Sequence, residues 1–243
     1  MYFQIDNTNV RVLGSIHVFP VNVPEVPRWA RDAYTWAEEL AFETDWAAIG
    51  DEFNLPHGQA LSDHLPKDVW ERLVANWSAD LGELHRTPAW LAFMQLWKIG
   101  AQTKHGLDVQ FRELAVKDGK TIHYLETPVE FADSMRTVPP GDVLLALNEA
   151  ISSIGENDKG IKGMFSDWNK RDLDTMFRRV RKKPIITVSS LRRAALTGRN
   201  ETWLRAMREL CKSERKVLVV VGGLHLYGEG NLLQLLERDI VRL

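Results

Sequence analysis

Two apolar runs that end at glycine, one near each end of the chain, predict buried β-strands. The first covers residues 10–14 and the second covers 217–222, and both are rich in β-branched residues. A histidine follows each terminal glycine after two further residues, at His17 and His225. In an open α/β sheet, ligands bind just beyond the carboxyl ends of such strands. The pattern therefore places both histidines where this kind of fold carries out chemistry.

Strand-like and helix-like segments alternate along the rest of the chain. Residues 2–5 and 9–13 predict a β-hairpin, and a helix over 25–40 is long enough to cross over to a parallel strand at 41–44. Further helices are expected over 66–77, 87–103, 106–117, 128–137, 141–154, 171–182, 199–213 and 229–238, and further strands over 121–125, 216–221 and 240–243. The polar, glycine-bearing segment 155–163 predicts a mobile loop or lid.

This order of elements predicts an α/β fold: a mixed central β-sheet flanked by helices, with a largely helical middle block. At 243 residues and 44% apolar content, the chain can bury its core as one domain over 1–243. The helical block over about 45–105 would then be an insertion or a lid. No short-period repeat of the solenoid type interrupts this arrangement.

Charge and composition exclude several classes of partner. A formal net charge of −2 gives no electrostatic case for nucleic acid or for an anionic membrane. The chain also has no apolar segment long enough to span a bilayer, and residues 1–6 lack the features of a secretory signal. A single cysteine, Cys211, excludes an internal disulfide and fits a reducing compartment. We therefore expect a cytoplasmic protein.

Four of the expected strands end in a polar residue: His17, Glu43, Glu126 and His225. If these strands are parallel neighbours, imidazoles and carboxylates meet at one rim of the sheet. Two histidines and one carboxylate are a familiar open metal site, and a remaining carboxylate can orient a ligand or act as a general base. Each residue also has a structural interpretation, since a loop histidine often bonds only to nearby backbone and Glu126 can cap the helix that follows it.

Well-known catalytic and nucleotide-binding motifs are absent from the sequence. The chain carries no His-Glu-x-x-His pair, no Gly-x-Ser-x-Gly elbow, no P-loop lysine and no Gly-x-Gly-x-x-Gly. The glycine-rich turn over 222–230 suits either an anion cradle or close packing. The two Gly-x-x-His units remain the main chemical signal.

Short blocks that follow one another along the chain resemble the TraB/GumN family, which includes the TIKI proteases and is related to the erythromycin-esterase and ChaN-like group. The blocks are Leu-Gly-Ser-Ile-His-Val at 13–18, Glu43, Gly-Leu-Asp at 106–108 with Ala115, Leu-Glu-Thr at 125–127, Arg199-Asn200, and Val-Val-Gly-Gly-Leu-His-Leu at 220–226 with Gly228. Each block is short, but together and in order they are fairly specific and cover most of the chain.

The resemblance implies a catalytic role for four residues at the sheet rim. These are His17, Glu43, Arg199 and His225, with supporting roles for Gly14, Glu126, Asn200 and Gly222. In TIKI-like members this is a divalent-metal-dependent peptidase, which implies manganese or cobalt held by His17, Glu43 and His225. Such a metal would lower the pKa of its bound water and polarise a carbonyl, while Arg199 would face the developing oxyanion and Asn200 would orient its neighbours.

Two alternatives to the metal-dependent hydrolase stay open at this point. In one, a histidine acts as general base on water without a metal, as in an esterase. In the other, the same fold binds a ligand or peptide without catalysis, in a groove lined by its tryptophan-rich helices. The expected partners are a peptide or small-molecule substrate and, as an oligomeric form, a homodimer.

Overall fold

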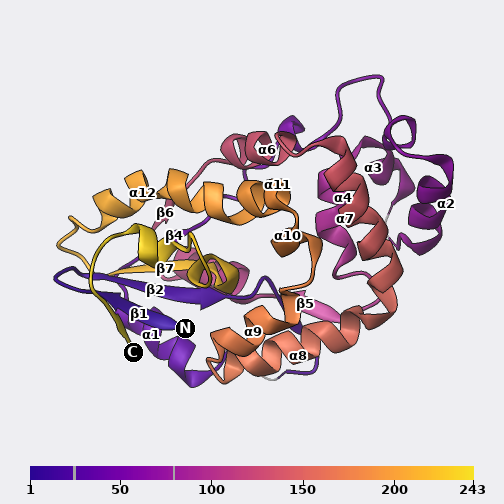
Figure 1. The fold of residues 1–243 in the computed structure, drawn as a ribbon. Coiled ribbons are helices and arrows are strands. Elements are labelled where there is room, and N and C mark those ends of the chain that lie inside the picture. The colour runs from indigo at the N-terminus through magenta and orange to yellow at the C-terminus, as the bar shows by residue number, and fades with distance from the viewer. Residues whose placement is uncertain (24–25, 79) are drawn as a thin grey trace.

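The computed structural model describes residues 1–23, 26–78 and 80–243, and these build a six-stranded sheet with the order β6-β4-β7-β2-β1-β8 (Figure 1). Its strands are β1 (Tyr2–Ile5), β2 (Val10–Ser15), β4 (Glu39–Phe42), β6 (Thr121–Tyr124), β7 (Val217–Gly222) and β8 (Ile240–Arg242). The strands β6, β4, β7 and β2 run parallel, whereas β1 and β8 are antiparallel to their neighbours. The expected mixed α/β fold is confirmed, with the hairpin at one side of the sheet.

Helices make up most of the rest of the molecule (Figure 1). Some pack on this sheet, and others form a group of their own beside it. The helices are α1 (Arg28–Trp36), α2 (Lys67–Asn76), α3 (Leu81–Arg86), α4 (Ala89–Leu96), α5 (Leu107–Lys117), α6 (Pro128–Arg136), α7 (Pro140–Ser153), α8 (Asn157–Asn169), α9 (Leu173–Val180), α10 (Pro184–Thr187), α11 (Ser189–Arg192), α12 (Gly198–Leu210) and α13 (Leu232–Leu235). A small second sheet pairs β3 (Val18–Pro20) with β5 (Thr103–His105). Within the three described segments, no helix combines the length and the apolar character needed to cross a bilayer.

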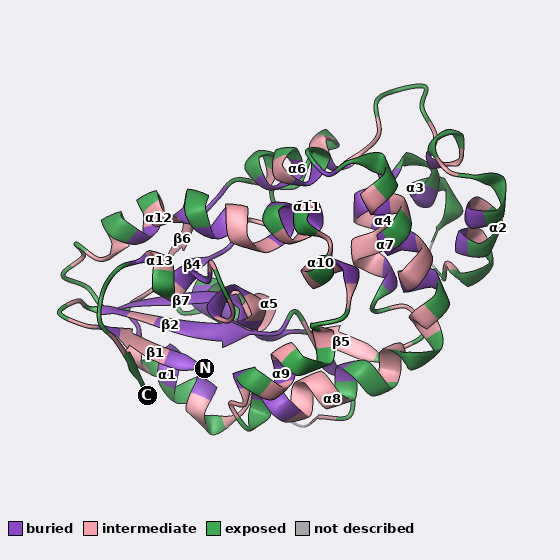
Figure 2. Cartoon of the chain, in the orientation of Figure 1, coloured by how far each residue is buried: buried purple, intermediate pink, exposed green. Residues whose placement is uncertain are grey.

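Strand β7 lies at the centre of the core. Every residue of β7 is buried, because it is flanked by β4 and β2 and covered on both faces (Figure 2). This explains its unbroken apolar run, which is typical of a central parallel strand. The indole of Trp168 in α8 is fully buried against the sheet, and its Nε1 donates a hydrogen bond to Gly14 O at 2.8 Å.

The helices α2, α3, α4 and α7 gather around an apolar cluster of their own, away from the sheet (Figure 1). Its fully buried members are Leu61, Leu73, Leu84, Ala92, Leu96 and Leu147. The expected helical middle block is therefore present, with α7 added to it from later in the chain. Its role as a lid stays a prediction.

The expected loop over 155–163 is wrong, because this segment is a 3₁₀ turn (Ile154–Glu156) followed by helix α8. Contacts from elsewhere in the chain stabilise it: Asn157 Nδ2 donates to the carbonyls of Leu96 and Ile99 at 2.8 and 2.9 Å. One of its glycines also has a packing role, since a Cβ on Gly163 would lie 2.6 Å from the guanidinium of Arg179. The polar composition thus reflects one solvated helix face and not a mobile segment.

Several element boundaries also differ from expectation. The described part of the first helix is α1, and the expected start at Glu25 lies outside the described residues. Strand β4 begins at Glu39, earlier than expected, because the chain pairs with β6 and β7 there. Of the helix expected over 87–103, only α4 is helical. It begins after Pro88 and ends at Leu96, and the strand β5 begins at Thr103. The helix expected over 229–238 is reduced to the short α13.

Candidate functional site

The residues that follow the parallel strands lie next to one another at the rim of the sheet. His17 follows β2, Glu43 follows β4 and His225 follows β7, and β7 is the strand between β4 and β2. Glu126 follows β6, which pairs with β4. The parallel order thus brings together all four polar residues that the strand ends predicted. Thr127 caps helix α6 in place of Glu126, so the alternative role for that glutamate is wrong.

Arg199, at the start of helix α12, forms ion pairs with two of these carboxylates, Glu43 and Glu126. Its Nη2 donates to Glu43 Oε2 at 2.8 Å, and its Nε donates to Glu126 Oε1 at 2.9 Å. Trp203, one turn along α12, donates from Nε1 to Glu126 Oε2 at 3.0 Å, and its ring lies 4.7 Å from the guanidinium carbon. The arginine is only 5% exposed, so the pairs lie in a desolvated environment where each charge depends on its partner.

A π-helical turn over Arg193–Thr197 leads into α12 and sets the position of Arg199. Arg199 Nη1 donates to the carbonyl of Ala195 inside this turn at 3.2 Å. Gly198 permits the carbonyl of Arg193 to approach the backbone closely, because a Cβ on Gly198 would lie 2.7 Å from Arg193 O. Single π turns inside helices occur frequently at functional sites.

The hydrogen bonds of His225 identify its tautomer. Asn200 Nδ2 donates to Gly230 O at 2.9 Å, which leaves Asn200 Oδ1 as the acceptor for His225 Nδ1 at 2.7 Å. The proton is therefore on Nδ1. Nε2 accepts a hydrogen bond from Arg199 Nη1 at 3.4 Å and lies 3.8 Å from Glu43 Oε1. Burial lowers the pKa of His225 to about 3 against the opposing effect of Glu43, so this imidazole is neutral at neutral pH.

His17 is the exposed member of the group, with 47% of its side chain accessible. Its Nδ1 bonds to Asp108 Oδ2 at 3.1 Å, from the first turn of α5. Burial of the ring lowers its pKa, but the charge and hydrogen bond of Asp108 and the charge of Glu43 outweigh this and raise it to about 9. His17 is therefore a cation at neutral pH when no other cation is bound.

Glu43 and Gly222 define the small space at the centre of the group. Burial would raise the pKa of Glu43, but Arg199 and the histidines outweigh it, helped by the Gly222 N–H at 2.6 Å, and the pKa falls to about 2. A Cβ on Gly222 would lie 3.1 Å from His17 Nε2 and 3.2 Å from Glu43 Oε1. The missing side chain thus leaves room where an imidazole and a carboxylate face each other.

The donor atoms around this space are of the types that bind divalent cations. Two imidazole Nε2 atoms and a carboxylate oxygen are present, although His225 Nε2 and Glu43 Oε1 also accept from Arg199 Nη1 and Gly222 N. The Nδ1 of each histidine is held by Asp108 or Asn200, as is typical of metal-ligating histidines. In the part of the chain that the structure describes, no three His, Cys, Asp or Glu side chains are grouped closely enough to hold an ion.

Asp108 and Trp203 belong to the site but were not predicted as site residues. Asp108 lies far from His17 in the sequence, in the block Gly-Leu-Asp that contributed to the family resemblance. Trp203 lies four residues after Arg199, so the two share one helix face and that spacing was the available signal. Gly14, expected to support the site, packs against Gly223 and Leu226, which lie 3.2 Å from the position of its missing Cβ, and its supporting role stays a prediction.

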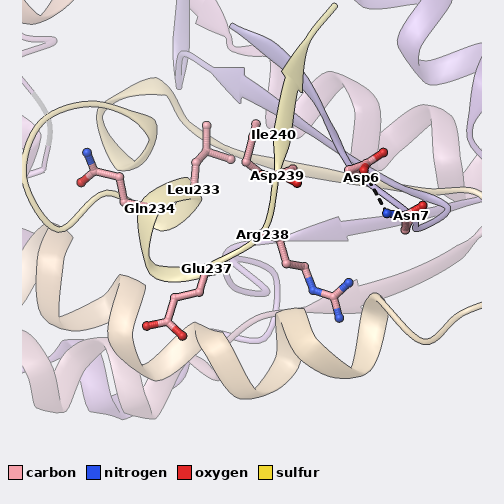
Figure 3. A pocket seen from close by; sticks show the side chains of 8 residues that line it. All are labelled: Asp6, Asn7, Leu233, Gln234, Glu237, Arg238, Asp239 and Ile240. Carbon is pink, nitrogen blue, oxygen red and sulfur yellow. Dashed lines mark hydrogen bonds between the residues drawn. The ribbon is translucent and has the colours of Figure 1, made fainter.

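An open groove of about 650 Å³ lies at a different place, between the β1–β2 turn and the segment from α13 to β8 (Figure 3). Its lining includes Asp6, Asn7, Glu237 and Arg238. Because Asp6 and Asn7 precede β2 and His17 follows it, the groove and the histidine are at opposite ends of this strand. The groove is thus separate from the rim site.

The TraB/PrgY/gumN family model matches residues 3–241, nearly the whole chain. The uncharacterized protein YbaP of Escherichia coli strain K12 is 27% identical over 246 aligned residues, which cover 95% of this chain and 89% of YbaP. YbaP of Shigella flexneri shows the same identity and coverage. No solved structure matches the chain.

Proposed function

The chain belongs to the TraB/PrgY/GumN family, and from this premise we propose that it is a hydrolase with His17, Glu43 and His225 at its reaction centre. One observation carries the proposal. Two histidines from opposite ends of the chain place their Nε2 atoms beside the same carboxylate, while their Nδ1 atoms are held by side-chain oxygens. Ester or amide bonds of a peptide or a small molecule are the substrates that such a centre suits.

The buried and exposed members of the centre have different tasks in this proposal. His17, half exposed, lies where water and substrate enter, whereas His225 and Glu43 are 3% and 6% exposed. Arg199 holds its hydrogen bonds with Glu43 and Glu126 behind them, which favours a positioning role for it over direct contact with an oxyanion. Asn200 keeps His225 Nε2 directed at Arg199 Nη1 and Glu43 Oε1.

A divalent cation, with manganese or cobalt as first candidates, is part of the proposal. His17 Nε2, Glu43 Oε1 and His225 Nε2 would hold it, and when bound it would lower the pKa of a water molecule and polarise the carbonyl that is attacked. The local charges support this. Among the described residues around the centre, the carboxylates of Glu43, Glu126 and Asp108 meet Arg199 and the protonated His17, so one negative charge is left for a cation to balance.

Replacing His17 with alanine is expected to lower hydrolysis by about 100-fold or more, since its imidazole contacts the reacting group. The measurement uses panels of chromogenic esters and fluorogenic peptides with protein purified without a metal-affinity tag. The control is His105→Ala, because His105 is exposed and lies 3.7 Å from the surface residue Glu113. A wild-type protein that cleaves none of these probes, or equal loss in both variants, would contradict the proposal.

Removal of divalent cations by chelation is expected to abolish the same activity, and added Mn²⁺ is expected to restore it. Activity that survives exhaustive chelation but is lost in His17→Ala would show that His17 acts as a metal-free base. In that case the rate should rise toward pH 9, because Asp108 and Glu43 hold the pKa of His17 at about 9 against burial and only the neutral ring accepts a proton.

A further inference from the structure

Ser15, the last residue of β2, has a buried hydroxyl that no protein group satisfies. The residue is 1% exposed, and its Oγ has no hydrogen-bond partner in the described part of the protein. Buried polar atoms are almost always hydrogen-bonded, so an unpaired hydroxyl in a well-packed region indicates that another molecule binds there. A serine hydroxyl can both donate and accept such a bond.

The sheet register shows which way Ser15 faces. In the parallel pairing of β2 with β7, Ser15 is the direct partner of Gly222. Side chains alternate between the two faces of a sheet along each strand, and register partners on neighbouring parallel strands share a face. A Cβ on Gly222 would point at His17 Nε2 and Glu43 Oε1, so Ser15 lies on the face that carries these two atoms.

The strand order places Ser15 across this space from Glu43. Glu43 follows β4 and Ser15 ends β2, with Gly222 of β7 between them. Because Gly222 contributes no side chain, an oxygen atom lying over it is next to His17 Nε2 and Glu43 Oε1, on the face of the sheet that Ser15 shares.

We propose that Ser15 is a further catalytic residue, whose hydroxyl binds the reacting water over Gly222. This inference rests on the proposed hydrolase function. Ser15 keeps its own proton in the reaction. The water oxygen forms the new bond to the carbonyl carbon, and the bond from that carbon to the leaving group breaks. One water proton goes to the leaving group and the other ends on the acid product, while Ser15 fixes the direction of attack through its hydrogen bond.

The kinetic test is Ser15→Ala, which removes the hydroxyl and adds no volume. We expect kcat to fall by about 10- to 100-fold with KM little changed, as for the loss of one hydrogen bond to a reacting group. The thermal midpoint should change little, because the hydroxyl makes no hydrogen bond to another protein group. Ser15→Thr, which keeps the hydroxyl, should retain most of the rate. Thr87→Val, which removes a buried hydroxyl bonded to Glu83 O in the helical block, should leave kcat unchanged.

A high-resolution crystal structure tests the same inference without any substrate. An ordered oxygen atom at about 2.5–3.0 Å from Ser15 Oγ, over Gly222, is expected in the wild type and should be absent in Ser15→Ala. If Ser15 Oγ instead bonds to a backbone carbonyl, or kcat is unchanged in Ser15→Ala, the inference is overturned even for an active hydrolase. If the oxygen is present but no probe is cleaved, the proposed function fails while Ser15 still binds that oxygen.

Discussion

The Arg199→Met protein is expected to lose about 3–5 kcal/mol of its free energy of unfolding, because the change leaves two buried carboxylates without their cation. Arg199 donates to Glu43 and to Glu126, and all three side chains are at most 8% exposed. Methionine has a similar length but no charge, so the loss reports mainly the broken ion pairs. Urea unfolding of wild type and variant at neutral pH measures the difference.

Two further variants make this result specific. Arg199→Met combined with Glu126→Gln should recover part of the lost stability, since one of the unpaired charges is removed as well. Arg193→Met should change stability by about 0.5 kcal/mol or less, because Arg193 pairs with Glu201 on the surface and is 69% exposed. If Arg199→Met is no less stable than Arg193→Met, the buried ion pairs do not stabilise the fold.

Gly106→Ala is expected to cost about 3 kcal/mol of stability and to lower hydrolysis by about 100-fold, through the backbone that carries His17. A Cβ on Gly106 would lie 2.1 Å from Ile16 O and 2.2 Å from the carbonyl carbon of His17. Backbone atoms cannot move aside as a side chain can, so the 16–17 segment must shift away from Asp108. Unfolding curves and the rate with the best probe measure both effects.

A second glycine supplies the matched control for this substitution. Gly160 lies inside α8, and nothing lies within 4 Å of a Cβ added to it. Gly160→Ala should therefore raise stability by up to about 1 kcal/mol, as alanine favours a helix over glycine. Full activity in Gly106→Ala, with stability equal to that of Gly160→Ala, would contradict the idea that close backbone contact positions His17.

The parts of the site that follow strands could be predicted from the sequence. The apolar runs that became β2 and β7 are local signals, and parallel strands bring their ends to one rim, so the convergence of His17, Glu43, Glu126 and His225 followed from a correct strand reading. The polar segment around Gly160 was predicted wrongly because its helix does not follow from a local signal. Its helix depends on contacts made by Asn157 and Trp168 with distant segments.

The partners of the predicted residues were harder to foresee. Whether the guanidinium of Arg199 meets substrate or protein depends on how α12 packs on the sheet, and no local pattern contains that information. The same applies to Asp108, whose pairing with His17 joins the start of α5 to the end of β2. Strand order predicted which residues meet, whereas side-chain packing decided what each of them bonds to.

The central place of β7 in the sheet also has a consequence for how the protein is made. A nascent chain leaves the ribosome with β2, β4 and β6 long before residue 217 is added, so β2 and β4 wait without the strand that separates them. During that time both have a free edge open to wrong partners. The arrival of β7 pairs these edges, and His225 follows directly after it, so the four parallel strands and the group at their rim are completed at the same stage.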